Sequence, residues 1–584
     1  MKRKANSEPR LILGASLGNC VHVAGVLNFL SLAETRGYHT EFLGPATPID
    51  TILNRVEETQ ANIIGLSYRL TPKVGAQLVT ELSQKVKERG FEKKTWLFGG
   101  TTPVVNEVRK SGFFDIYFDS TSTDEDILTF LATNCDPITY LNQQKQKSAQ
   151  LYASNLIDRL AQRRPWPLIR HHFGLPDLEE TIDGVRDIAE AKCLDIISIG
   201  PDQNAQQFFF RPDEMKSTLE GAGGVPLRTK EDLQNLYDAS RCGNYPLMRC
   251  YSGTQDLLKW AKLLQETIKN AWCATPIHWY SVLDGRSTRP LKQAIQENME
   301  NIAWHGANGI PVEVNEPHHW SLRQAHDTIA VASAYWSAFI AKSMGVRDYI
   351  IQMMMNTPLG TAPSMDLAKM WATLALVESL ENDTFKTHRQ VRTGLLSLPV
   401  DLDAAKGQLA SSMYTAMMLK PEIVHVVGFC EADHSATAQD VTESCHIVRQ
   451  VVKECLLGLP NPLLDPLIMK RRDQLVREAI LLLDVLMELP EDSAIHPLLN
   501  PETYFLGLEF GVLDAPDLLG NPHAQGRLKT RVINGAYYAI DAQANPLTEE
   551  TRLQVCIPEI MKLIRSKKKC TRKFPLFIPS EVKL

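Results

Sequence analysis

The sequence has few cysteines, no excess of basic residues and no hydrophobic run long enough for an obvious membrane anchor. Eleven cysteines are spread over 584 residues, with no CxxC pair, which excludes a disulfide scaffold and a zinc ribbon. The 62 lysines and arginines face 68 acids, for a net charge of −6. That balance excludes binding to nucleic acid or an anionic membrane by bulk charge. A reducing cytoplasm is the expected compartment.

Two uncharged stretches resemble membrane segments at first sight. Leu11–Ala33 follows a basic start, but polar and glycine residues interrupt it. We therefore expect a strand, a glycine turn and a helix there rather than a signal peptide. Thr328–Ala341 is too short to span a bilayer core of about 30 Å. With 44% hydrophobic and 22% charged residues, the composition is typical of a globular chain with a large core.

The first 135 residues alternate short apolar runs with segments of helical spacing. The expected strands are 11–15, 39–43, 63–67, 95–98 and 115–118. Ser122-x-x-Glu125 predicts a capping box for a helix over 124–131. Five such units indicate a doubly wound, flavodoxin-like parallel sheet, which binds ligands at the carboxyl ends of its strands.

Distinctive residues follow three of these expected strands. His22-x-x-Gly25 follows the first strand, Ser67 ends the third, and Gly99-Gly100 ends the fourth. Each feature is weak alone, because a histidine in such a loop is commonly a cap and paired glycines are commonly a turn. Together and in this order they resemble the cobalamin-binding domain of corrinoid enzymes. The pattern of that family is Asp-x-His-x-x-Gly, then Ser-x-Leu, then Gly-Gly.

This resemblance implies a role for each residue. In that family the histidine is the lower axial ligand of cobalt, which would make His22 a metal ligand. The serine and glycines let the nucleotide tail of the cofactor lie between sheet and helices. The implied cofactor contacts are Gly25, Ser67, Gly99, Gly100 and Thr101. Cys20 replaces the aspartate that orients the histidine, and Leu70 comes one place late. Cobalamin binding is therefore better supported than coordination by the histidine.

The rest of the chain indicates a second, larger α/β domain. Residues 136–165 are polar and indicate a linker with a surface helix, after which strand–helix alternation resumes. The expected strands are 194–199, 247–251, 276–280, 311–315, 349–353 and 423–427. A TIM-like (β/α)8 barrel over 166–460 fits this length, with functional residues at the strand carboxyl ends. We expect 461–584 to be an α+β extension that wraps the barrel and ends in a basic surface tail.

The order of segments in this part resembles the large subunit of adenosylcobalamin-dependent glutamate mutase, also called methylaspartate mutase. Val314-Asn315-Glu316-Pro317 resembles that family's Asn-Arg-Glu-Pro segment, and Val512–Pro516 resembles its Gly-Val-Ile-Asp-Val-Pro segment. The resemblance covers most of the chain. It implies that the cobalamin module and the mutase barrel, which are usually separate chains, are fused here with the module first.

The same resemblance implies contacts in the barrel. Arg249 matches an arginine that binds a substrate carboxylate, for which a bidentate guanidinium is suited. Arg170 matches a second arginine, and Tyr280 matches a tyrosine that faces the substrate. Glu431 matches a glutamate that holds the adenosyl ribose, and Glu316 is a further implied cofactor contact.

Three positions depart from the mutase pattern. The family's third arginine falls near Asn204, its glutamate base falls near Ala274, and the lysine that accompanies the ribose-binding glutamate is Val427. We therefore expect the scaffold to be retained and the substrate to differ from glutamate, with fewer carboxylates.

These features predict an adenosylcobalamin-dependent isomerase that rearranges a small carboxylic acid by radical chemistry. A corrinoid-dependent methyltransferase is an alternative, although no helical bundle precedes the module and no zinc set is evident. His318-His319 lack a third ligand at a convincing spacing. A second alternative is a non-catalytic cobalamin-binding or sensing protein on a mutase scaffold. We expect a cytoplasmic homodimer that binds neither nucleic acid nor membrane.

Overall fold

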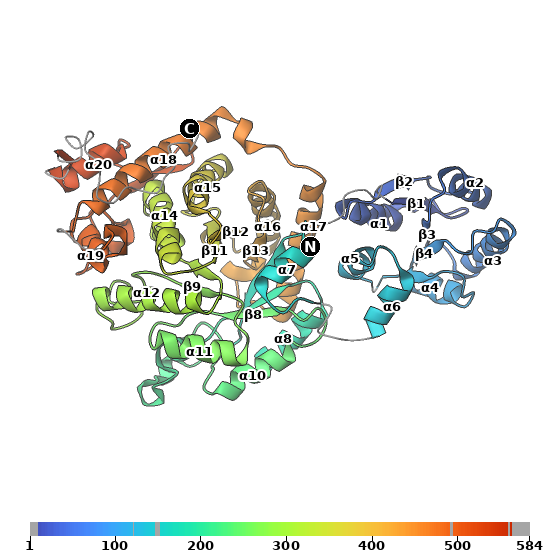
Figure 1. The fold of residues 1–584 in the computed structure, drawn as a ribbon, viewed down its shortest axis with the longest axis horizontal. Coiled ribbons are helices and arrows are strands. Elements are labelled where there is room, and N and C mark those ends of the chain that lie inside the picture. The colour runs from blue at the N-terminus through green and yellow to red at the C-terminus, as the bar shows by residue number, and fades with distance from the viewer. Residues whose placement is uncertain (1–9, 121, 146–151, 491–494, 559–560, 563–584) are drawn as a thin grey trace. The chain divides into compact units, whose positions relative to one another are not determined.

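The computed structural model describes residues 10–120, 122–145, 152–490, 495–558 and 561–562 (Figure 1). The chain divides after Leu151 into two compact units. Within the described ranges, no helix is both long enough and apolar enough to cross a membrane. The basic tail expected at Lys567–Lys573 lies outside the described residues.

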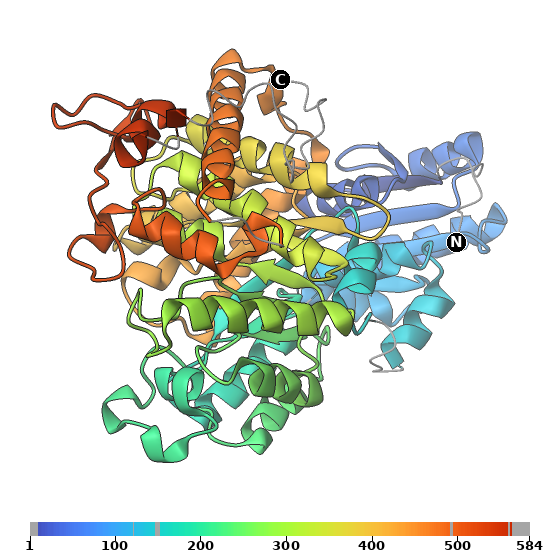
Figure 2. The same ribbon diagram turned by 60° about the vertical axis from the view of Figure 1, so that its left-hand side comes forward.

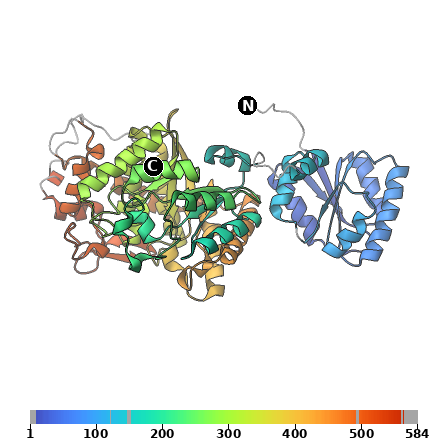
Figure 3. The same cartoon turned by 90° about the horizontal axis from the view of Figure 1, so that it is seen from below.

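The first unit is a parallel five-stranded sheet with helices on both faces (Figure 3). Its strands are β1 (Leu11–Ser16), β2 (His39–Phe42), β3 (Ile63–Tyr68), β4 (Thr95–Gly100) and β5 (Ile116–Phe118). Its helices are α1 (Ala24–Thr35), α2 (Ile49–Thr59), α3 (Pro72–Glu88), α4 (Thr102–Arg109), α5 (Asp124–Ala132) and α6 (Pro137–Lys145). The strand order β2-β1-β3-β4-β5 is one of the two common orders of doubly wound sheets. The five predicted strands are confirmed to within two residues.

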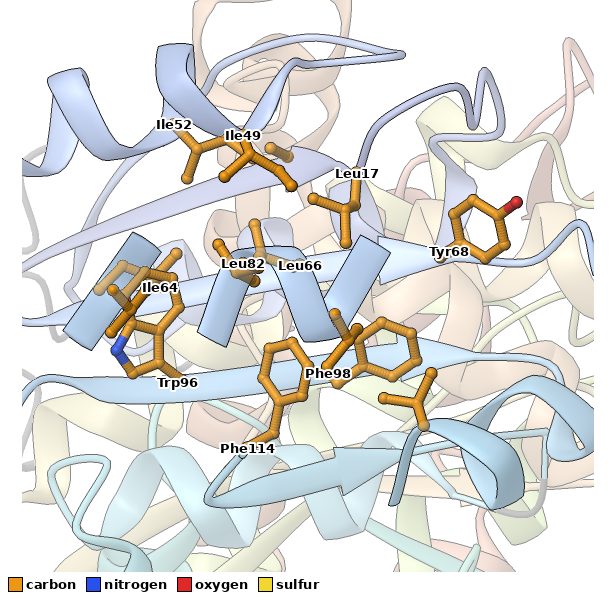
Figure 4. Packing of buried hydrophobic residues seen from close by; sticks show 14 of the residues in the cluster. Leu17, Ile49, Ile52, Ile64, Leu66, Tyr68, Leu82, Trp96, Phe98 and Phe114 are labelled. Carbon is orange, nitrogen blue, oxygen red and sulfur yellow. The ribbon is translucent and has the colours of Figure 1, made fainter. Parts of the chain in front are cut away.

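The core of this unit fills one face of the sheet under α2, α3 and α4 (Figure 4). Alternate residues of the central strands, among them Leu66 and Phe98, point into it because side chains alternate along a strand. On the other face α1 comes close to the sheet. A Cβ at Gly14 would lie 2.7 Å from Leu30 Cδ1, so any larger residue there would have to displace the Leu30 side chain. The start of α1 is thereby held beside the carboxyl end of β1.

The capping box of α5 lies one residue beyond the predicted one. Thr123 accepts a hydrogen bond from Asp126 N, and the Asp126 carboxylate accepts one from Thr123 N. The prediction of Ser122 and Glu125 is therefore wrong, although the helix itself is confirmed.

The second unit contains eight parallel strands in a nearly closed barrel. They are β6 (Leu168–Phe173), β7 (Ile196–Ile199), β8 (Leu247–Cys250), β9 (Cys273–Thr275), β10 (Val312–Val314), β11 (Asp348–Met354), β12 (Lys386–Arg392) and β13 (Ile423–Val426). β6 pairs with β13, so the ring closes between the first and last strands. The two ends of the sheet are β8 and β9, where Ala271 N donates to Met248 O at 2.9 Å. An α/β fold with a barrel is confirmed.

Three barrel strands differ from the sequence-based prediction. The strand expected over 276–280 is wrong, since β9 ends at Thr275. Pro276 has no N–H, and Ile277 N donates to Glu316 Oε2 at 2.8 Å instead of to a neighbouring strand. β6 and β12 were not predicted, because charged and polar residues that face the barrel interior interrupt their apolar runs.

An apolar cluster closes one end of the barrel interior. It includes Leu168, Ile196, Leu247 and Ile423 from the strands, and helix α7 (Leu156–Arg163) adds buried leucines to it. α7 lies where the sequence indicated a linker with a surface helix. Functional side chains are therefore confined to the opposite, carboxyl end of the strands.

Long helices surround the barrel (Figures 1 and 2). α14 (Asp327–Ser343) is buried on nearly every side, which explains the uncharged run noted in the sequence. α15 (Pro363–Val377) packs beside it, and α18 (Pro466–Met487), orange in Figure 2, lies across both. The other helices are α8 (Leu178–Glu190), α9 (Gln203–Phe208), α10 (Lys230–Ala239), α11 (Leu257–Thr267), α12 (Leu291–Ala307), α13 (Glu316–Leu322), α16 (Leu402–Met417) and α17 (Ala438–Leu457). The C-terminal part adds α19 (Pro501–Glu509), the hairpin β14 (Thr530–Ile533) and β15 (Ala536–Ala539), and α20 (Glu549–Cys556).

Candidate functional sites in the two units

The first unit contains a pocket of about 310 Å³ at the carboxyl end of its sheet. Its walls come from the ends of β3 and β4, the start of α1, and the loop between β5 and α5. All six residues that the cobalamin resemblance implies in this unit line the pocket: His22, Gly25, Ser67, Gly99, Gly100 and Thr101. The pocket lies beside the β1–β3 switch point, where doubly wound sheets bind their ligands.

His22 lies in the loop that leads into α1, and its side chain is exposed. Ser16 Oγ donates to the His22 carbonyl oxygen at 2.8 Å, which fixes the loop to the end of β1. Cys20 is fully buried, and its Sγ lies 4.0 Å from His22 Nδ1. A thiol at this distance holds the imidazole less firmly than the carboxylate of the resembling family would.

The pocket floor is made of small residues. Ser67 Oγ lies 3.1 Å from Ser16 Oγ, so two hydroxyls meet between β1 and β3. Gly25 has no atom within 4 Å of the place where a Cβ would lie, and at Gly99 the nearest is the Phe118 carbonyl oxygen at 4.0 Å. Both glycines therefore open onto free space. Gly100 differs, since a Cβ there would lie 2.5 Å from the Tyr68 carbonyl oxygen, so strand packing requires this glycine.

Several lining residues were missed by the sequence analysis. Asn28, Phe118, Ser120 and Ile127 line the pocket from α1 and from the β5–α5 region. Asn28 Nδ2 donates to Asp124 Oδ1 at 3.1 Å, which ties α1 to α5 across the pocket. These residues share no motif, so only the meeting of their elements in space identifies them.

The second unit brings Arg249 and Arg170 together inside the barrel. Both side chains are at most 1% exposed. Arg170 Nε donates to Ser198 Oγ at 2.8 Å, and Arg249 Nη1 lies 3.4 Å from the same hydroxyl. Both guanidinium groups also lie about 5 Å from the Trp272 ring centre, at 5.2 Å and 5.0 Å. Among the described residues, no hydrogen-bond partner reaches Arg249 Nε or Nη2.

Glu313 is the one carboxylate among the described residues that contact these two arginines. Its Oε2 lies 3.4 Å from Arg170 Nη1 and accepts from Trp272 Nε1 at 2.8 Å and Gln390 Nε2 at 3.0 Å. Burial and the neighbouring Arg249 lower the pKa of Arg170 well below its ordinary value, whereas Glu313 raises it. The cluster thus holds more positive than negative charge out of water, which favours an anionic ligand.

A third arginine and several histidines extend this cluster. Arg392, at the end of β12, acts on the pKa of Arg170, and its Nε has no partner in the described part of the chain. Burial and the surrounding arginines lower the pKa of His172, His318 and His425 well below the ordinary value. These imidazoles are therefore neutral at neutral pH. The sequence analysis missed Arg392 because it did not predict β12.

Tyr280 lies in the loop after β9 and has an unusual backbone. Its φ is +60°, a left-handed conformation for a residue with a large side chain. Tyr280 N donates to Asp284 Oδ2 at 3.1 Å, and its carbonyl oxygen accepts from Ser287 Oγ at 3.0 Å and Arg289 Nη2 at 2.9 Å. Burial raises the pKa of the phenol to about 12. A strained backbone held from both sides is typical of functional positions.

The two predicted glutamates lie in different surroundings. Glu316 is fully buried at the start of α13, where Ile277 N donates to Oε2 and His278 Nδ1 lies 2.8 Å from Oε1. Its carboxylate therefore organises the loop after β9. Glu431 is exposed in a short 3-10 helix, Phe429–Ala432, after β13.

The three positions that depart from the mutase pattern carry no charge in this cluster. Asn204 Nδ2 donates to the Lys216 carbonyl oxygen at 2.8 Å. Ala274 on β9 and Val427 after β13 are both buried. The third arginine of this barrel is instead supplied by Arg392.

Comparison with known solved structures finds distant neighbours. No protein-family model and no curated protein matches the chain. Among solved structures, a cobalamin-binding protein from Desulfitobacterium hafniense DCB-2 is similar over 20% of this chain and 57% of its own, with 24% identity and a TM-score of 0.19. OxsB, described as a cobalamin-dependent S-adenosylmethionine radical enzyme, is similar in its apo form over 76% of this chain and 56% of its own, with 12% identity and a TM-score of 0.18.

The form of OxsB with aqua-cobalamin bound is similar over the same shares, with 11% identity and a TM-score of 0.18. This chain thus covers less than two thirds of each neighbour. At such identities and TM-scores, overall similarity assigns neither a family nor an activity.

Proposed function

We propose that this protein binds adenosylcobalamin and is an isomerase of the carbon-skeleton mutase type, acting on a small carboxylic acid other than glutamate. The observation that carries the proposal is the meeting, in one pocket at the switch point of the first unit, of six residues that the sequence resemblance implies. The cationic interior of the barrel adds a place for the carboxylate of a substrate.

The lining of the pocket supports binding of the nucleotide tail of a corrinoid. Gly25 and Gly99 leave space that any side chain would fill, and the Ser67 hydroxyl, which Ser16 Oγ contacts from beneath, offers a polar contact in the pocket. His22, exposed beside this space, can offer an imidazole nitrogen to cobalt. When bound, adenosylcobalamin supplies a carbon radical by homolysis of its cobalt–carbon bond. The protein's part is to bind, orient and enclose.

The barrel residues support binding of a carboxylate. Arg249 Nε and Nη2 have no hydrogen-bond partner among the described residues, and together they present the edge that a carboxylate accepts in a bidentate manner. Arg170 is held in place by Ser198 and Glu313 and adds positive charge beside it. Tyr280, with its phenol kept protonated, can donate a hydrogen bond to the bound acid.

The charged groups around Arg170 and Arg249 disfavour an amino acid as the substrate. Glu313 already contacts Arg170 and accepts from Trp272 and Gln390, so it is not free to pair with a substrate ammonium group. Three nearby guanidinium groups would repel that ammonium. Glutarate, which is glutamate without its amino group, should therefore bind more tightly than glutamate, and isothermal titration of both acids would measure this.

Cofactor binding is tested with the purified full-length chain, free of corrinoid, titrated with adenosylcobalamin and aquocobalamin and followed by absorbance. A valine at Gly99, where a Cβ would come no closer than 4.0 Å to the Phe118 carbonyl oxygen, takes up pocket space and should weaken binding by about ten- to a hundredfold, the equivalent of about 1–3 kcal/mol. Gly407→Val is a control of equal volume on α16, where a Cβ also meets no atom. An unchanged corrinoid spectrum at high micromolar wild-type protein would overturn the proposal.

The reaction class needs a separate measurement. Anaerobic EPR of the loaded enzyme with a panel of small acids should show a cob(II)alamin–radical signal for the substrate of a mutase. Methyl transfer to an added thiol, without that signal, would support the methyltransferase alternative. Binding without either activity would support a sensor.

A further inference from the structure

A second candidate site lies on the outer side of the barrel wall, at the carboxyl ends of β6 and β13. Cys430, His434 and Asp440 place one ligand atom each within 4.8 Å of one another. His434 Nε2 and Asp440 Oδ2 are 3.2 Å apart. Two such ligands of a tetrahedral zinc ion lie about 3.3 Å apart, given bonds of about 2.0–2.1 Å. The two atoms form an ion pair in the protein alone, and a metal ion would replace that contact without a large movement of either side chain.

His171 on β6 lies beside this trio, outside the group of ligand atoms that are within 4.8 Å of one another. Its neighbours Arg170 and His172 belong to the interior cluster, so alternation along the strand turns His171 outward. Its Nε2 lies 3.1 Å from the point that a Cβ at Gly428 would occupy, and Cys430 Sγ lies 3.4 Å from the same point. A glycine at 428 thus leaves room between imidazole and thiol.

The Nε2 atom of the His171 imidazole has a lone pair that can bind a metal. Its Nδ1 contacts the His172 carbonyl oxygen, which can only accept, so Nδ1 carries the proton and Nε2 carries the lone pair. The side chain is 4% exposed, and Nε2 has no hydrogen-bond partner in the described part of the chain. Metal-binding histidines commonly donate their other nitrogen to a backbone carbonyl in this way.

The imidazole of His434 is also oriented by an oxygen beside its other nitrogen. Its Nδ1 lies 2.7 Å from Asp433 Oδ2, so a carboxylate orients the ring with Nε2 facing Asp440. A carboxylate behind a ligating imidazole fixes the tautomer and strengthens the ligand. Asp440 also closes the capping box of α17 with Thr437, which fixes the carboxylate at the helix start.

We infer that Cys430, His434, Asp440 and His171 form a zinc site that joins β6, the β13–α17 loop and α17. A thiolate, two imidazoles and a carboxylate suit Zn²⁺ better than Mg²⁺ or Ca²⁺, which prefer oxygen ligands. The Cys430 thiol gives its proton to solvent as the metal binds. The site holds in place the loop that carries Glu431 and the strand that carries Arg170. It does not depend on the corrinoid proposal.

The experiment uses the full-length, corrinoid-free chain, with Zn²⁺ titrated in competition with a chromophoric chelator. One equivalent of zinc should bind. Cys430→Ser and His434→Gln should each weaken binding by more than a hundredfold, and Asp433→Asn by about ten- to a hundredfold, the usual effect of losing a supporting carboxylate. Cys455→Ser, at the other end of α17, is the matched control and should bind like the wild type.

Cobalt substitution supplies a second readout. Co²⁺ added to the same protein should give tetrahedral d–d bands and a thiolate charge-transfer band, which Cys430→Ser removes and Cys455→Ser keeps. Since His434 is exposed, His434→Gln tests the site even if the cysteine variant misfolds. Absence of stoichiometric zinc, or zinc affinity unchanged in both ligand variants, would overturn the inference whatever the outcome with cobalamin.

Discussion

Replacing Arg249 with lysine separates a ligand-binding arginine from a structural one. Arg249 is fully buried, yet its Nε and Nη2 have no partner among the described residues. Its contact with the Ser198 hydroxyl is long, at 3.4 Å. Lysine keeps the positive charge but loses the planar edge with two parallel donors. The substitution should therefore remove ligand contacts and few protein contacts.

The magnitude follows from the bonds that are lost. A charge-assisted hydrogen bond contributes about 1.5–3 kcal/mol, so losing the bidentate contact should weaken anion binding by about ten- to a hundredfold. The free energy of unfolding should change by less than about 1 kcal/mol, because among the described residues the weak serine contact is the only hydrogen bond given up.

The assay compares acid binding with stability in the same variants. Small mono- and dicarboxylic acids are first screened by thermal shift, and the tightest is then titrated calorimetrically against wild type and Arg249→Lys. Arg159→Lys is the control, because Arg159 is equally buried but donates to the carbonyl oxygens of Ala153 and Tyr245, both at 2.9 Å. It should lose stability and keep acid affinity. An Arg249→Lys protein that is unstable but binds acids normally would refute the reasoning.

Three further changes have defined outcomes. Glu313→Gln leaves the buried Arg170 without its ion-pair partner and should lower the free energy of unfolding by about 3–5 kcal/mol in urea denaturation; a loss under 1 kcal/mol would contradict this. Burial lowers the pKa of His388, but two acid partners raise it to about 9, above the unfolded value of about 6.5. Its contribution, at most about 3 kcal/mol, is complete below pH 6.5 and lost as the pH rises through 9, so His388→Gln should flatten the stability–pH curve there. His22→Ala should abolish the superhyperfine pattern of isotopically labelled histidine in cob(II)alamin EPR, and a benzimidazole-type pattern in the wild type would exclude axial coordination by His22.

The first unit could be predicted closely because its motif residues follow the strands that its apolar pattern predicts. Its central strands β1 and β3 are apolar and buried along nearly their whole length, and the residues that line the pocket follow strands in the order that the motif requires. Cys20 shows the limit of motif reading. Its fully buried position and its distance from the imidazole, which decide how well it can replace an aspartate, appear only in the structure.

The barrel could be predicted only in part because its site lies inside it. β12 reads Lys-Thr-His-Arg-Gln-Val-Arg, and Gln390 within it contacts buried Glu313. A strand whose inner residues are polar has no apolar signature, so the elements that build the site were the hardest to predict. The opposite error occurred at 276–280, where an apolar run follows Pro276 and forms a loop held by Glu316. Arg392 was missed because it lies on β12, the strand without an apolar signature. Tyr280 was identified by the family resemblance and not from a predicted strand.

Pairing of β6 with β13 has a consequence for the order in which the parts of this protein fold during synthesis. On the ribosome the N-terminal unit emerges first, so it can fold while the second unit is still incomplete. The first barrel strand must wait for the last, because Arg170 on β6 pairs with His425 on β13. Until then β6 and the growing end of the sheet both expose unpaired edges, which invite association with other chains. Translation that stops before Ile423 should therefore yield a soluble N-terminal unit attached to an aggregation-prone, open sheet, so that binding of the cofactor by the nascent chain says nothing about whether its barrel has formed.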